Sequence, residues 1–533
     1  MPAPAGRRTA GSWGASASGF SSALSPHWGR RSGGSRTKRD RGCRRARAAA
    51  TLSTGLSDDH ESYQSPLSSR YASREMRANF SDRKKFTTWR RLWIALAEAE
   101  QALGLPIRDD QLTELREHAL DIDFELARHY ETELRHDVMA HIQAWGDVCP
   151  GARPILHLGA TSCFVGDNTD LIVMRDGLHL VRRQVVSLIA KLRGFALEWR
   201  SLPTLGFTHY QPAQATTVGK RACLWIQDLI HDLDDLQHAD HSIRFRGVKG
   251  TTGTQASFLS LFEGDHEKVL ELDRMVTEKM GFQRTFAVTG QTYPRQLDFR
   301  VCQVLSSIAQ SAHKFATDLR LLANLRELEE PFGKGQVGSS AMPWKRNPMR
   351  SERICSLARF VICQLDNTAH TAANQWLERT LDDSANRRLV LAESFLATDS
   401  ILNLWLNVAD GLIVNPAVVK KNLDAELPFL ASENVMLEAV RAGADRQDVH
   451  AAIRAHSIEA ALEIKAGGEN TMRERMLSDP KLGAIAGRLD ELLDGRHYVG
   501  RAPEQVLEFM TAEVDPVLER HADELGARGE VEV

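Results

Sequence analysis

The sequence has few cysteines and no long run of apolar residues. Its 533 residues include only seven cysteines, which are widely scattered and never spaced C-x-x-C. This distribution argues against a disulfide framework or a zinc site and fits a reducing compartment. No uninterrupted apolar run approaches the ~18 residues that a membrane span needs. We therefore predict a soluble protein with no membrane partner.

Several sequence motifs of common enzyme classes are also missing. The chain contains no H-E-x-x-H, no G-x-G-x-x-G after a strand and no G-x-x-x-x-G-K. Metal-dependent hydrolysis, dinucleotide chemistry and nucleoside triphosphate chemistry thus lack their usual marks. We expect neither a metal nor a cofactor. The content of 42% apolar and 26% charged residues is ordinary for a globular protein, and the length corresponds to about three or four domain-sized units.

The net charge of −3 is unevenly distributed. Residues 1–57 hold 11 Lys and Arg residues and one acid, a net charge of +10, so the remaining residues carry −13. This head lacks apolar periodicity, and we expect it to be disordered and non-catalytic. Its composition resembles that of an organelle transit peptide, but a basic nucleic-acid-binding arm or a functionless extension fits it as well. We expect a cytoplasmic protein, or a mitochondrial one if the head directs import.

The acidic remainder has no clustered basic face and no RNA-binding motif, so nucleic-acid binding is not the expected main function. Here helical periodicity dominates and strand signals are scarce. Apolar residues recur in steps of three and four at 87–103, 170–199, 294–330 and 388–409. A helix over 294–330 would be roughly 50 Å long, typical of a bundle element. We expect such rods to build an oligomer interface.

The fold class predicted from these patterns is all-α. The boundaries that we expect are a disordered extension at 1–57, an N-terminal helical domain at 58–160, a central long-helix bundle at 161–414 and a C-terminal helical domain at 415–533. Thr161 provides an N-cap signal at the start of the bundle, and Gly411 and Pro416 mark its end.

The most informative segment is 338–348, G-S-S-A-M-P-W-K-R-N-P. Asn347 can cap a helix and Pro348 suits its first position, so a helix is predicted from Met349 to about Leu365. The positive end of its dipole would point back toward Ser339 and Lys345. That arrangement favours an anion, or a serine that loses its proton. A plain Gly-Ser linker before a helix is the alternative reading.

Two further polar segments precede the first long helix. In 135–141, R-H-D-V-M-A-H, His136 taken by itself fits a surface or capping role better than catalysis, because most histidines do no catalysis. In 157–162, H-L-G-A-T-S, Thr161 and Ser162 stand where hydroxyl and free N–H groups can bind a carboxylate or phosphate. Simple capping of the helix explains these two residues equally well.

Two more segments lie later in the chain. In 205–214, L-G-F-T-H-Y-Q-P-A-Q, the polar and turn residues suggest a site loop, and only His209 can give a proton near neutral pH. A structural histidine explains His209 equally well. In 378–388, E-R-T-L-D-D-S-A-N-R-R, Ser384 and Arg388 are four positions apart and share one face of a predicted helix. Asp382 or Asp383 can cap the start of that helix. The run is either a solvated surface or, with its three arginines, a phosphate site.

Together these segments resemble the aspartase/fumarase superfamily, lyases that release fumarate from succinyl-bearing substrates. Within it, M-P-W-K-R-N-P-M-R-S-E, R-T-L-D-D-S-A-N-R-R and the block at 201–214 are similar to the adenylosuccinate lyase family. The resemblance runs from about Arg70 to Arg501 and does not include the basic head. Trp344 stands where animal members have tyrosine, and we attach no change of function to it.

The resemblance implies a three-domain, aspartase/fumarase-like subunit whose long-helix bundle assembles a homotetramer with active sites shared between three subunits. It implies the β-elimination of fumarate from adenylosuccinate, giving AMP, and from succinylaminoimidazole carboxamide ribotide, giving AICAR. Ser339 is then the general base and His209 the general acid. Lys345 supplies positive potential, and His136 contacts substrate or orients His209.

By the same resemblance, the substrates are succinyl-purine and succinyl-imidazole nucleotides. The substrate-binding residues that it implies are Arg70, Tyr71, Arg135, His136, Asp137, Thr161, Ser162, Gln291, Arg353, Arg379, Ser384 and Arg388. Two alternatives stay open at this point. One is a sister lyase acting on argininosuccinate or another succinyl compound. The other is a non-catalytic helical scaffold, which the presence of Ser339, Lys345, His209 and His136 disfavours.

Overall fold

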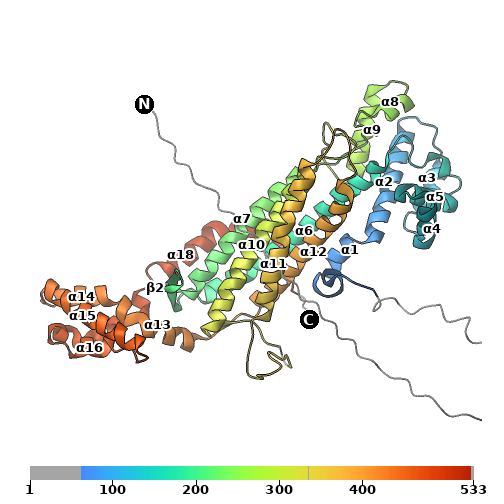
Figure 1. The fold of residues 1–533 in the computed structure, drawn as a ribbon. Helices are drawn as coiled ribbons and strands as arrows, with labels where there is room; N and C mark the ends of the chain where they lie inside the picture. Colours follow the sequence, from blue (N-terminus) through green and yellow to red (C-terminus); the bar gives the residue numbers. More distant parts are fainter. Residues whose placement is uncertain (1–61, 334, 530–533) are drawn as a thin grey trace, which may run out of the picture. The chain divides into compact units, whose positions relative to one another are not determined.

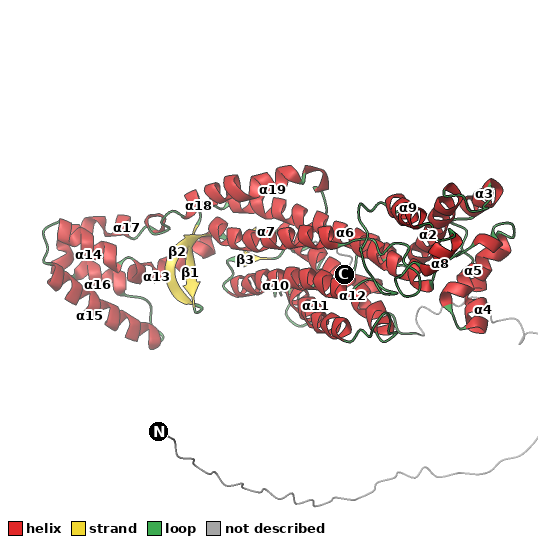
Figure 2. Cartoon of the chain, turned by 90° about the horizontal axis from the view of Figure 1, so that it is seen from above, coloured by secondary structure: helices red, strands yellow, loops and turns green. Residues whose placement is uncertain are grey.

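The computed structural model describes residues 62–333 and 335–529, so the predicted disordered extension at 1–57 lies outside the described residues. From residue 64 onward the chain forms one compact unit. Helices dominate this unit, with two short pairs of strands (Figures 1 and 2). The all-α class predicted from the periodicity is therefore confirmed.

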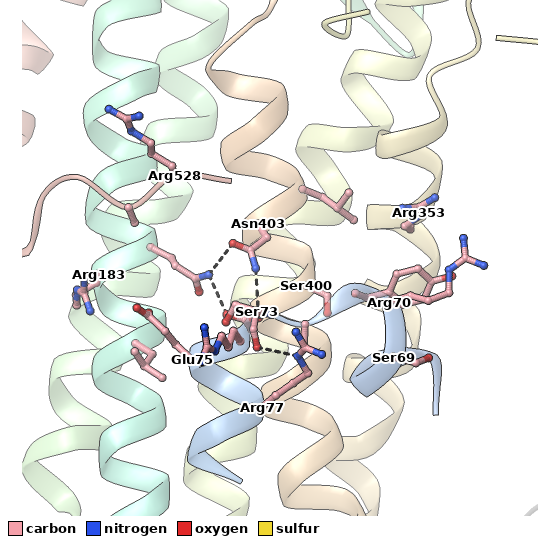
Figure 3. A pocket seen from close by; sticks show the side chains of 18 of the residues that line it. Ser69, Arg70, Ser73, Glu75, Arg77, Arg183, Arg353, Ser400, Asn403 and Arg528 are labelled. Atoms are coloured by element: carbon pink, nitrogen blue, oxygen red, sulfur yellow. Dashed lines mark hydrogen bonds between the residues drawn. The ribbon is translucent and has the colours of Figure 1, made fainter. Parts of the chain in front are cut away.

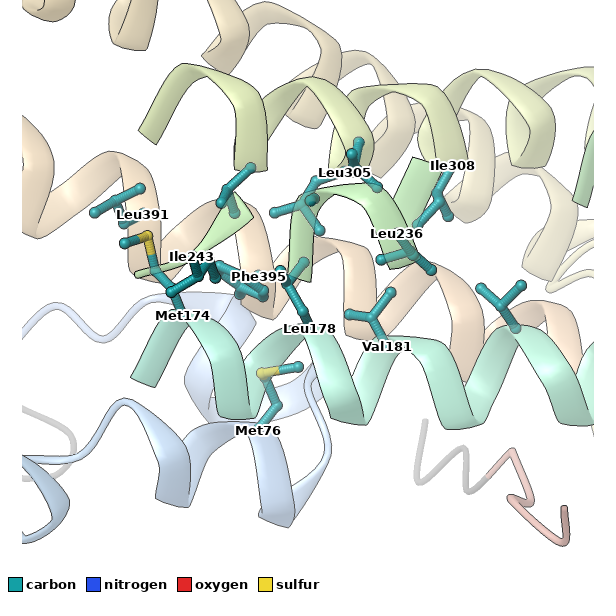
Figure 4. Close-up of a cluster of buried hydrophobic side chains, with 14 of the residues drawn as sticks. Met76, Met174, Leu178, Val181, Leu236, Ile243, Leu305, Ile308, Leu391 and Phe395 are labelled. Atoms are coloured by element: carbon teal, nitrogen blue, oxygen red, sulfur yellow. The ribbon is translucent and has the colours of Figure 1, made fainter. Parts of the chain in front are cut away.

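Five long helices form a bundle in the middle of this unit (Figure 1). They are α6 (Ser162–Glu198), α7 (Val218–Ser242), α10 (Gln296–Asn324), α11 (Met349–Ala373) and α12 (Asp383–Ala409). Their apolar stripes, spaced by three and four residues, face one another. Figure 4 shows the resulting core, where Leu178 and Val181 of α6 lie near Leu236 of α7, Leu305 of α10 and Phe395 of α12.

The predicted long helices are all present, with shifted ends. The first begins at Ser162 with Thr161 as its N-cap, as the N-cap signal predicted, and so starts before the apolar stripe at 170. The helix predicted over 294–330 is shorter, because α10 ends at Asn324 and Arg326 adopts a left-handed conformation with φ 59°. The chain then enters β3 (Leu328–Glu329), which pairs with β4 (Ile413–Val414). The helix after Pro348 runs to Ala373, beyond the predicted Leu365.

One helix in the described part of the chain, α12, is long and apolar enough to span a membrane by length and composition. Its most apolar window has a mean hydropathy of 1.3, but 83% of that window is buried inside the protein. It is the most enclosed helix of the bundle, with Phe395, Ile401 and Trp405 fully buried. Its apolar composition is thus accounted for by the core.

Shorter helices lie along one side of the bundle and cover the end where α6 begins. They are η2 (Leu67–Tyr71, a π-helical turn), α1 (Arg74–Asn79), α2 (Asp82–Ala102), α3 (Asp109–Glu117), α4 (Phe124–Leu134), α5 (Asp137–Val148) and η3 (Arg153–Ile155). Two helices from the α7–α10 connection, α8 (Ala256–Leu261) and α9 (His266–Lys279), join them, with α9 packing on α2. The helix predicted over 87–103 is α2, and its residues Trp89, Leu92 and Trp93 are buried as its periodicity indicated.

The C-terminal helices form two groups. The first has its own small core around Val435, Val449 and Met476, and comprises α13 (Pro416–Leu430), α14 (Ser432–Arg441), α15 (Arg446–Lys465), α16 (Met472–Ser478), η4 (Pro480–Arg488), α17 (Leu489–Leu492) and η5 (Gly495–His497). The second group returns to the bundle and comprises α18 (Ala502–Phe509), η6 (Met510–Val514), α19 (Asp515–Arg520) and η7 (Ala522–Glu524). The predicted domain boundaries stay predictions.

The segment predicted as a site loop is a β-hairpin. β1 (Pro203–Thr208) pairs antiparallel with β2 (Gln211–Thr217) directly after α6. The two-residue turn between them consists of His209 and Tyr210, with φ angles of 53° and 57°. Positive φ at both positions is the geometry of a type I′ turn, whose twist matches that of the strands. His209 therefore stands at the tip of a hairpin.

Candidate active site

One group of predicted site residues converges where α5, α6 and α12 begin. His136 is the N-cap of α5, and its Nδ1 accepts a hydrogen bond from the Met139 N–H at 3.3 Å. In the neutral ring this leaves the proton on Nε2, which lies 3.3 Å from Ser162 Oγ in the first turn of α6. Asp137 Oδ2 accepts from Arg388 Nη2 of α12 at 3.4 Å. Residues separated by up to 251 positions in the chain thus meet at one place.

Gln291 joins the same end of the bundle. Its side chain donates to the Thr251 carbonyl at 3.0 Å and accepts a hydrogen bond from Cys163 Sγ at 3.5 Å, next to Thr161 and Ser162. Its backbone N–H donates to the Glu378 carbonyl at 2.9 Å, which places it beside Arg379. A side chain at Gly290 would lie 2.6 Å from that same carbonyl, so this close approach requires glycine.

A buried ion network lies under these residues. Arg379 Nη1 lies 3.3 Å from Asp383 Oδ1, Asp383 Oδ2 accepts from Arg295 Nε at 2.6 Å, and Arg295 Nη2 lies 3.1 Å from Asp167 Oδ1. Burial alone would raise the pKa of Asp167, but Arg295 and nearby arginines outweigh it and hold that pKa below its usual value. The network keeps Asp167 ionised in the interior and fixes the guanidinium of Arg379.

Asp382 occupies the N-cap position of α12, as predicted for Asp382 or Asp383, but no side chain caps the helix. Neither side chain accepts a hydrogen bond from the first turn of α12. Asp383 is instead buried against Arg295, and Asp382 accepts from Asn374 Nδ2 at 2.6 Å. The competing partners are a buried guanidinium and a side-chain amide, which bind the carboxylates more favourably than the exposed helix end does.

A second group lines a cavity of about 550 Å³ beside the bundle (Figure 3). Arg70 and Tyr71 belong to the π-helical turn η2, and Arg353 belongs to the second turn of α11. The guanidinium of Arg353 lies 5.2 Å from the centre of the Tyr71 ring, within the range of a cation–π contact. Tyr71 thereby holds Arg353 against the cavity.

A third group consists of His209 and the segment at 338–348. His209 is exposed at the hairpin tip. Ser339 Oγ accepts from the Met342 N–H at 3.1 Å and from the Ala341 N–H at 3.4 Å. These two donors would favour the deprotonated hydroxyl over the neutral one.

The ends of this serine loop are held together at Gly338. Asn347 Nδ2 donates to the Gly338 carbonyl at 2.9 Å, and a side chain at Gly338 would lie 2.1 Å from the Lys345 carbonyl. Asn347 was predicted to cap α11, and this is wrong, because its amide closes the loop. Pro348 occupies the N-cap position, not the first helical one. Lys345 is exposed beside the start of this helix.

The first and third groups lie at opposite ends of α6. Ser162 opens this helix of 37 residues, and β1 begins shortly after its last residue. At about 1.5 Å per residue, α6 separates the His136 group from the hairpin by about 55 Å. The serine loop lies toward the hairpin end, because Glu327 next to β3 accepts from Thr204 of β1 at 3.4 Å. One chain therefore does not bring His136 together with His209 or Ser339.

Comparisons with known proteins agree with this architecture. A family model described as "Lyase" matches residues 136–363, and one described as "Adenylosuccinate lyase C-terminus" matches residues 428–509. The adenylosuccinate lyase of Schistosoma mansoni is 49% identical over 89% of this chain and 100% of its own length. That of Saccharomyces cerevisiae is 51% identical over 86% of this chain and 96% of its own. The chain belongs to the adenylosuccinate lyase family.

Solved structures show the same fold at lower identity. The 3-carboxy-cis,cis-muconate lactonizing enzyme from Pseudomonas putida is 22% identical, covers 85% of this chain and 100% of its own, and has a TM-score of 0.73. A fumarate lyase from Mesorhizobium sp. BNC1 covers 83% of this chain and 99% of its own, with a TM-score of 0.70. The predicted aspartase/fumarase fold and lyase class are thus confirmed for this adenylosuccinate lyase family member.

Two kinds of functional residue in this adenylosuccinate lyase family member escaped sequence reasoning. Asp167 and Arg295, which fix Arg379 through Asp383, were not predicted, because no sequence signal marks them as a buried pair. His157 lies in a predicted motif but is half-buried, accepts a hydrogen bond from Trp93 Nε1 at 2.8 Å, and has a pKa lowered to about 4 by desolvation and by nearby His136. It is a neutral structural residue under the site.

Proposed function

We propose that the protein catalyses the elimination of fumarate from adenylosuccinate, giving AMP, and from succinylaminoimidazole carboxamide ribotide, giving AICAR. The observation that carries this proposal is the meeting of His136, Asp137, Ser162 and Arg388 at one helix-start site. Hydroxyl, imidazole and guanidinium groups there suit a substrate with two carboxylates and a phosphate. The identity to adenylosuccinate lyases over nearly all of their length supports the same substrates.

The chemical step is a β-elimination. Ser339, as an alkoxide, takes the proton from the succinyl carbon next to a carboxylate, and the C–N bond breaks as the C=C bond of fumarate forms. Two backbone N–H groups already donate to its Oγ, and Lys345 and the start of α11 add positive potential. The same charges stabilise the carbanion that develops on the substrate.

His209 protonates the departing nitrogen of the purine or imidazole part. An imidazole suits this role because its ordinary pKa lies near neutral pH. The left-handed backbone at His209 and Tyr210 presents the ring at the hairpin tip, clear of the bundle. His136 hydrogen-bonds substrate or orients His209 in the assembled site.

The remaining predicted residues hold the substrate. Arg70, Tyr71 and Arg353 face one cavity, and Arg379, Ser384 and Arg388 follow the buried network, so both sets suit anionic groups. Asp137 is an acceptor and fits a ribose hydroxyl or a ring N–H. Arg135, Thr161, Ser162 and Gln291 complete the set.

The active site is assembled from several subunits of a homotetramer. The separation of about 55 Å between the ends of α6 supports this, because no single chain can bring the His136 group to His209. Apolar residues on the outer faces of the bundle, such as Leu224 of α7 and Leu389 of α12, are 47% and 62% exposed. Such residues suit burial against other subunits. We also propose a cytoplasmic location, with mitochondria as the alternative if residues 1–57 direct import.

A turnover assay of the purified full chain tests the function. We expect fumarate release from adenylosuccinate and from the imidazole carboxamide substrate, and none from argininosuccinate. A folded tetramer that releases fumarate only from argininosuccinate would favour the sister-lyase alternative. No release from any of the three would favour a scaffold.

A further inference from the structure

The cavity that contains Arg70 and Arg353 extends well beyond those two residues. Its walls come from η2, α1, α6, α11, α12 and residues 526–528 of the C-terminal segment. Six arginines line it, against the carboxylates of Glu75 and Asp399. These arginines are Arg70, Arg74, Arg77, Arg183, Arg353 and Arg528. An excess of positive charge around one cavity of about 550 Å³ favours an anionic ligand.

The cavity has two ends (Figure 3). Arg70 and Arg353 lie on one side of Ser73 and Asn403, while Arg183 and Arg528 lie on the other side, over α6. The first end holds residues of the proposed substrate site. The second end, formed by Arg183 and Arg528, is not used by the proposed reaction.

The floor between the two ends does not neutralise the arginines. Asp399 is buried and accepts from the Ser73 N–H at 2.6 Å, from Ser73 Oγ at 3.0 Å and from Gln184 Nε2 at 3.0 Å. Its carboxylate is thus occupied by neutral donors, and burial raises its pKa to about 6. Arg77 is also engaged, donating to the Ser68 carbonyl at 2.9 Å. With six arginines against two carboxylates, the cavity keeps a net positive charge.

The backbones that carry Arg183 and Arg528 are held firmly. Arg183 lies within α6, beside Arg182, which pairs with Glu524 at 2.9 Å. On either side of Arg528, the Ala527 N–H donates to Ser187 Oγ at 3.0 Å and the Gly529 carbonyl accepts from Asn407 Nδ2 at 3.3 Å. Neither Arg183 nor Arg528 makes a hydrogen bond or ion pair within the described residues 62–333 and 335–529. Both side chains are exposed to the cavity, and neither of its two carboxylates, Glu75 and Asp399, forms an ion pair with them, so both guanidinium groups can bind an anion.

We propose that the Arg183–Arg528 end of this cavity is a second binding site, separate from the substrate end, for a phosphate group. Two guanidinium forks match the oxygens of a phosphate dianion in geometry and in charge. The volume exceeds that of one phosphate ion, so the group is either free phosphate or the phosphoryl end of a nucleotide. Occupancy would tie the C-terminal segment to α6.

Titration calorimetry on the full-length protein tests this site, with inorganic phosphate and ATP as separate probes. The variant R183A/R528A should bind the probe at least about tenfold more weakly than wild type, because it removes both charge-assisted contacts. R183K/R528K keeps the charge without the fork and should fall in between. The matched control is R91A/R446A, which removes two exposed arginines outside the cavity.

The probes separate the sources of the phosphate. Weakened binding of phosphate alone identifies the free ion, and weakened binding of ATP identifies a nucleotide. Equal affinities for R183A/R528A and R91A/R446A with both probes would overturn the proposal. Fumarate release in phosphate-free buffer should be the same in both variants. Its loss in R183A/R528A alone would place Arg183 and Arg528 in the substrate site and overturn the separate site as well.

Discussion

The two ends of the bundle are built differently. At the start of α6, the predicted substrate-binding residues rest on a buried network in which Arg295 has a side chain only 1% exposed and pairs with both Asp167 and Asp383. At the other end, His209 and Ser339 lie on a hairpin tip and a loop, held by backbone geometry and a few hydrogen bonds. The predicted binding groups are thus preorganised within one chain, while the predicted proton-transfer groups project outward, where the proposed mechanism has a second subunit complete them.

The largest effect on activity is expected from the end of the bundle that carries His209 and Ser339, called the projecting end here. His209→Ala and Ser339→Ala should each lower kcat by about 10²–10⁴, because each removes a group that transfers a proton. Neither change should alter the thermal unfolding midpoint, since both residues lie in loops outside the core. Stopped assays of fumarate release and thermal melts measure the two quantities. Ser340→Ala is the matched control. An equal loss of kcat in that variant would contradict the role of Ser339 as the general base.

Substitutions in the buried ion network around Arg295 should lower the free energy of unfolding. Arg295→Met keeps most of the volume but leaves Asp167 and Asp383 buried without their cation, which costs about 3–5 kcal/mol of unfolding free energy. The surface pair of Arg193 and Asp515 offers a control, because Arg193→Met should cost only about 0–1 kcal/mol. Denaturant unfolding followed by circular dichroism compares the two. Similar losses of unfolding free energy in Arg295→Met and Arg193→Met would show that the buried network stabilises the fold no more than the Arg193–Asp515 pair does.

The buried carboxyl group of Glu100 offers a contrast with the paired carboxylate of Asp167 in the network. Glu100 of α2 is fully buried, its carboxylate has no hydrogen-bond partner among the described residues, and burial raises its pKa to about 9. Because the folded state holds this proton more tightly, the stabilisation is complete below the unfolded pKa of about 4.5 and is lost as pH rises toward 9. Glu100→Gln removes this dependence.

The stability of Glu100→Gln relative to wild type should therefore increase between pH 5 and pH 8, by up to about 1.4 kcal/mol per pH unit. Unfolding midpoints measured across that range check the slope. The paired carboxylate of Asp167, whose pKa is lowered, provides the contrast within the same part of the molecule. A difference between wild type and Glu100→Gln that does not change with pH would show that Glu100 is not protonated in the folded state.

The smallest effect is expected from the basic head. Deletion of residues 1–57 should leave kcat and oligomer size unchanged, because the head lacks the apolar periodicity needed to join the core. Turnover and size-exclusion chromatography of the truncated chain check this. Import of the full chain into mitochondria with loss of the head would replace the cytoplasmic location with the alternative.

Periodicity predicted the long helices but not what ends them. Apolar residues continue past Asn324, so the stop of α10 at a left-handed Arg326 was not visible in the pattern. The hairpin was missed because its turn consists of His209 and Tyr210, without the Asn-Gly or Asp-Gly signal of most such turns.

The site residues could be predicted where a motif resembled that of a known family. The buried ion network beneath them could not. The five motifs pointed to His136, His209 and Ser339, but the network joins Asp167 to Arg295 across 128 positions of the chain. Charges in a helical run normally indicate a solvated face, and only the packed fold shows that these two are buried together. The same holds for Asn347, whose helix-capping potential was overridden by the Gly338 carbonyl.

Mixing two inactive variants tests most directly whether the two ends combine in one active site. His136→Ala/Arg388→Ala disables the binding end, and His209→Ala disables the projecting end, about 55 Å away in the same chain. Hybrid tetramers formed by random exchange should regain up to about a quarter of wild-type fumarate release. A site is rebuilt when its binding end comes from a His209→Ala chain and its His209 comes from a His136→Ala/Arg388→Ala chain. Verified hybrids that remain as inactive as both parents would contradict the shared site.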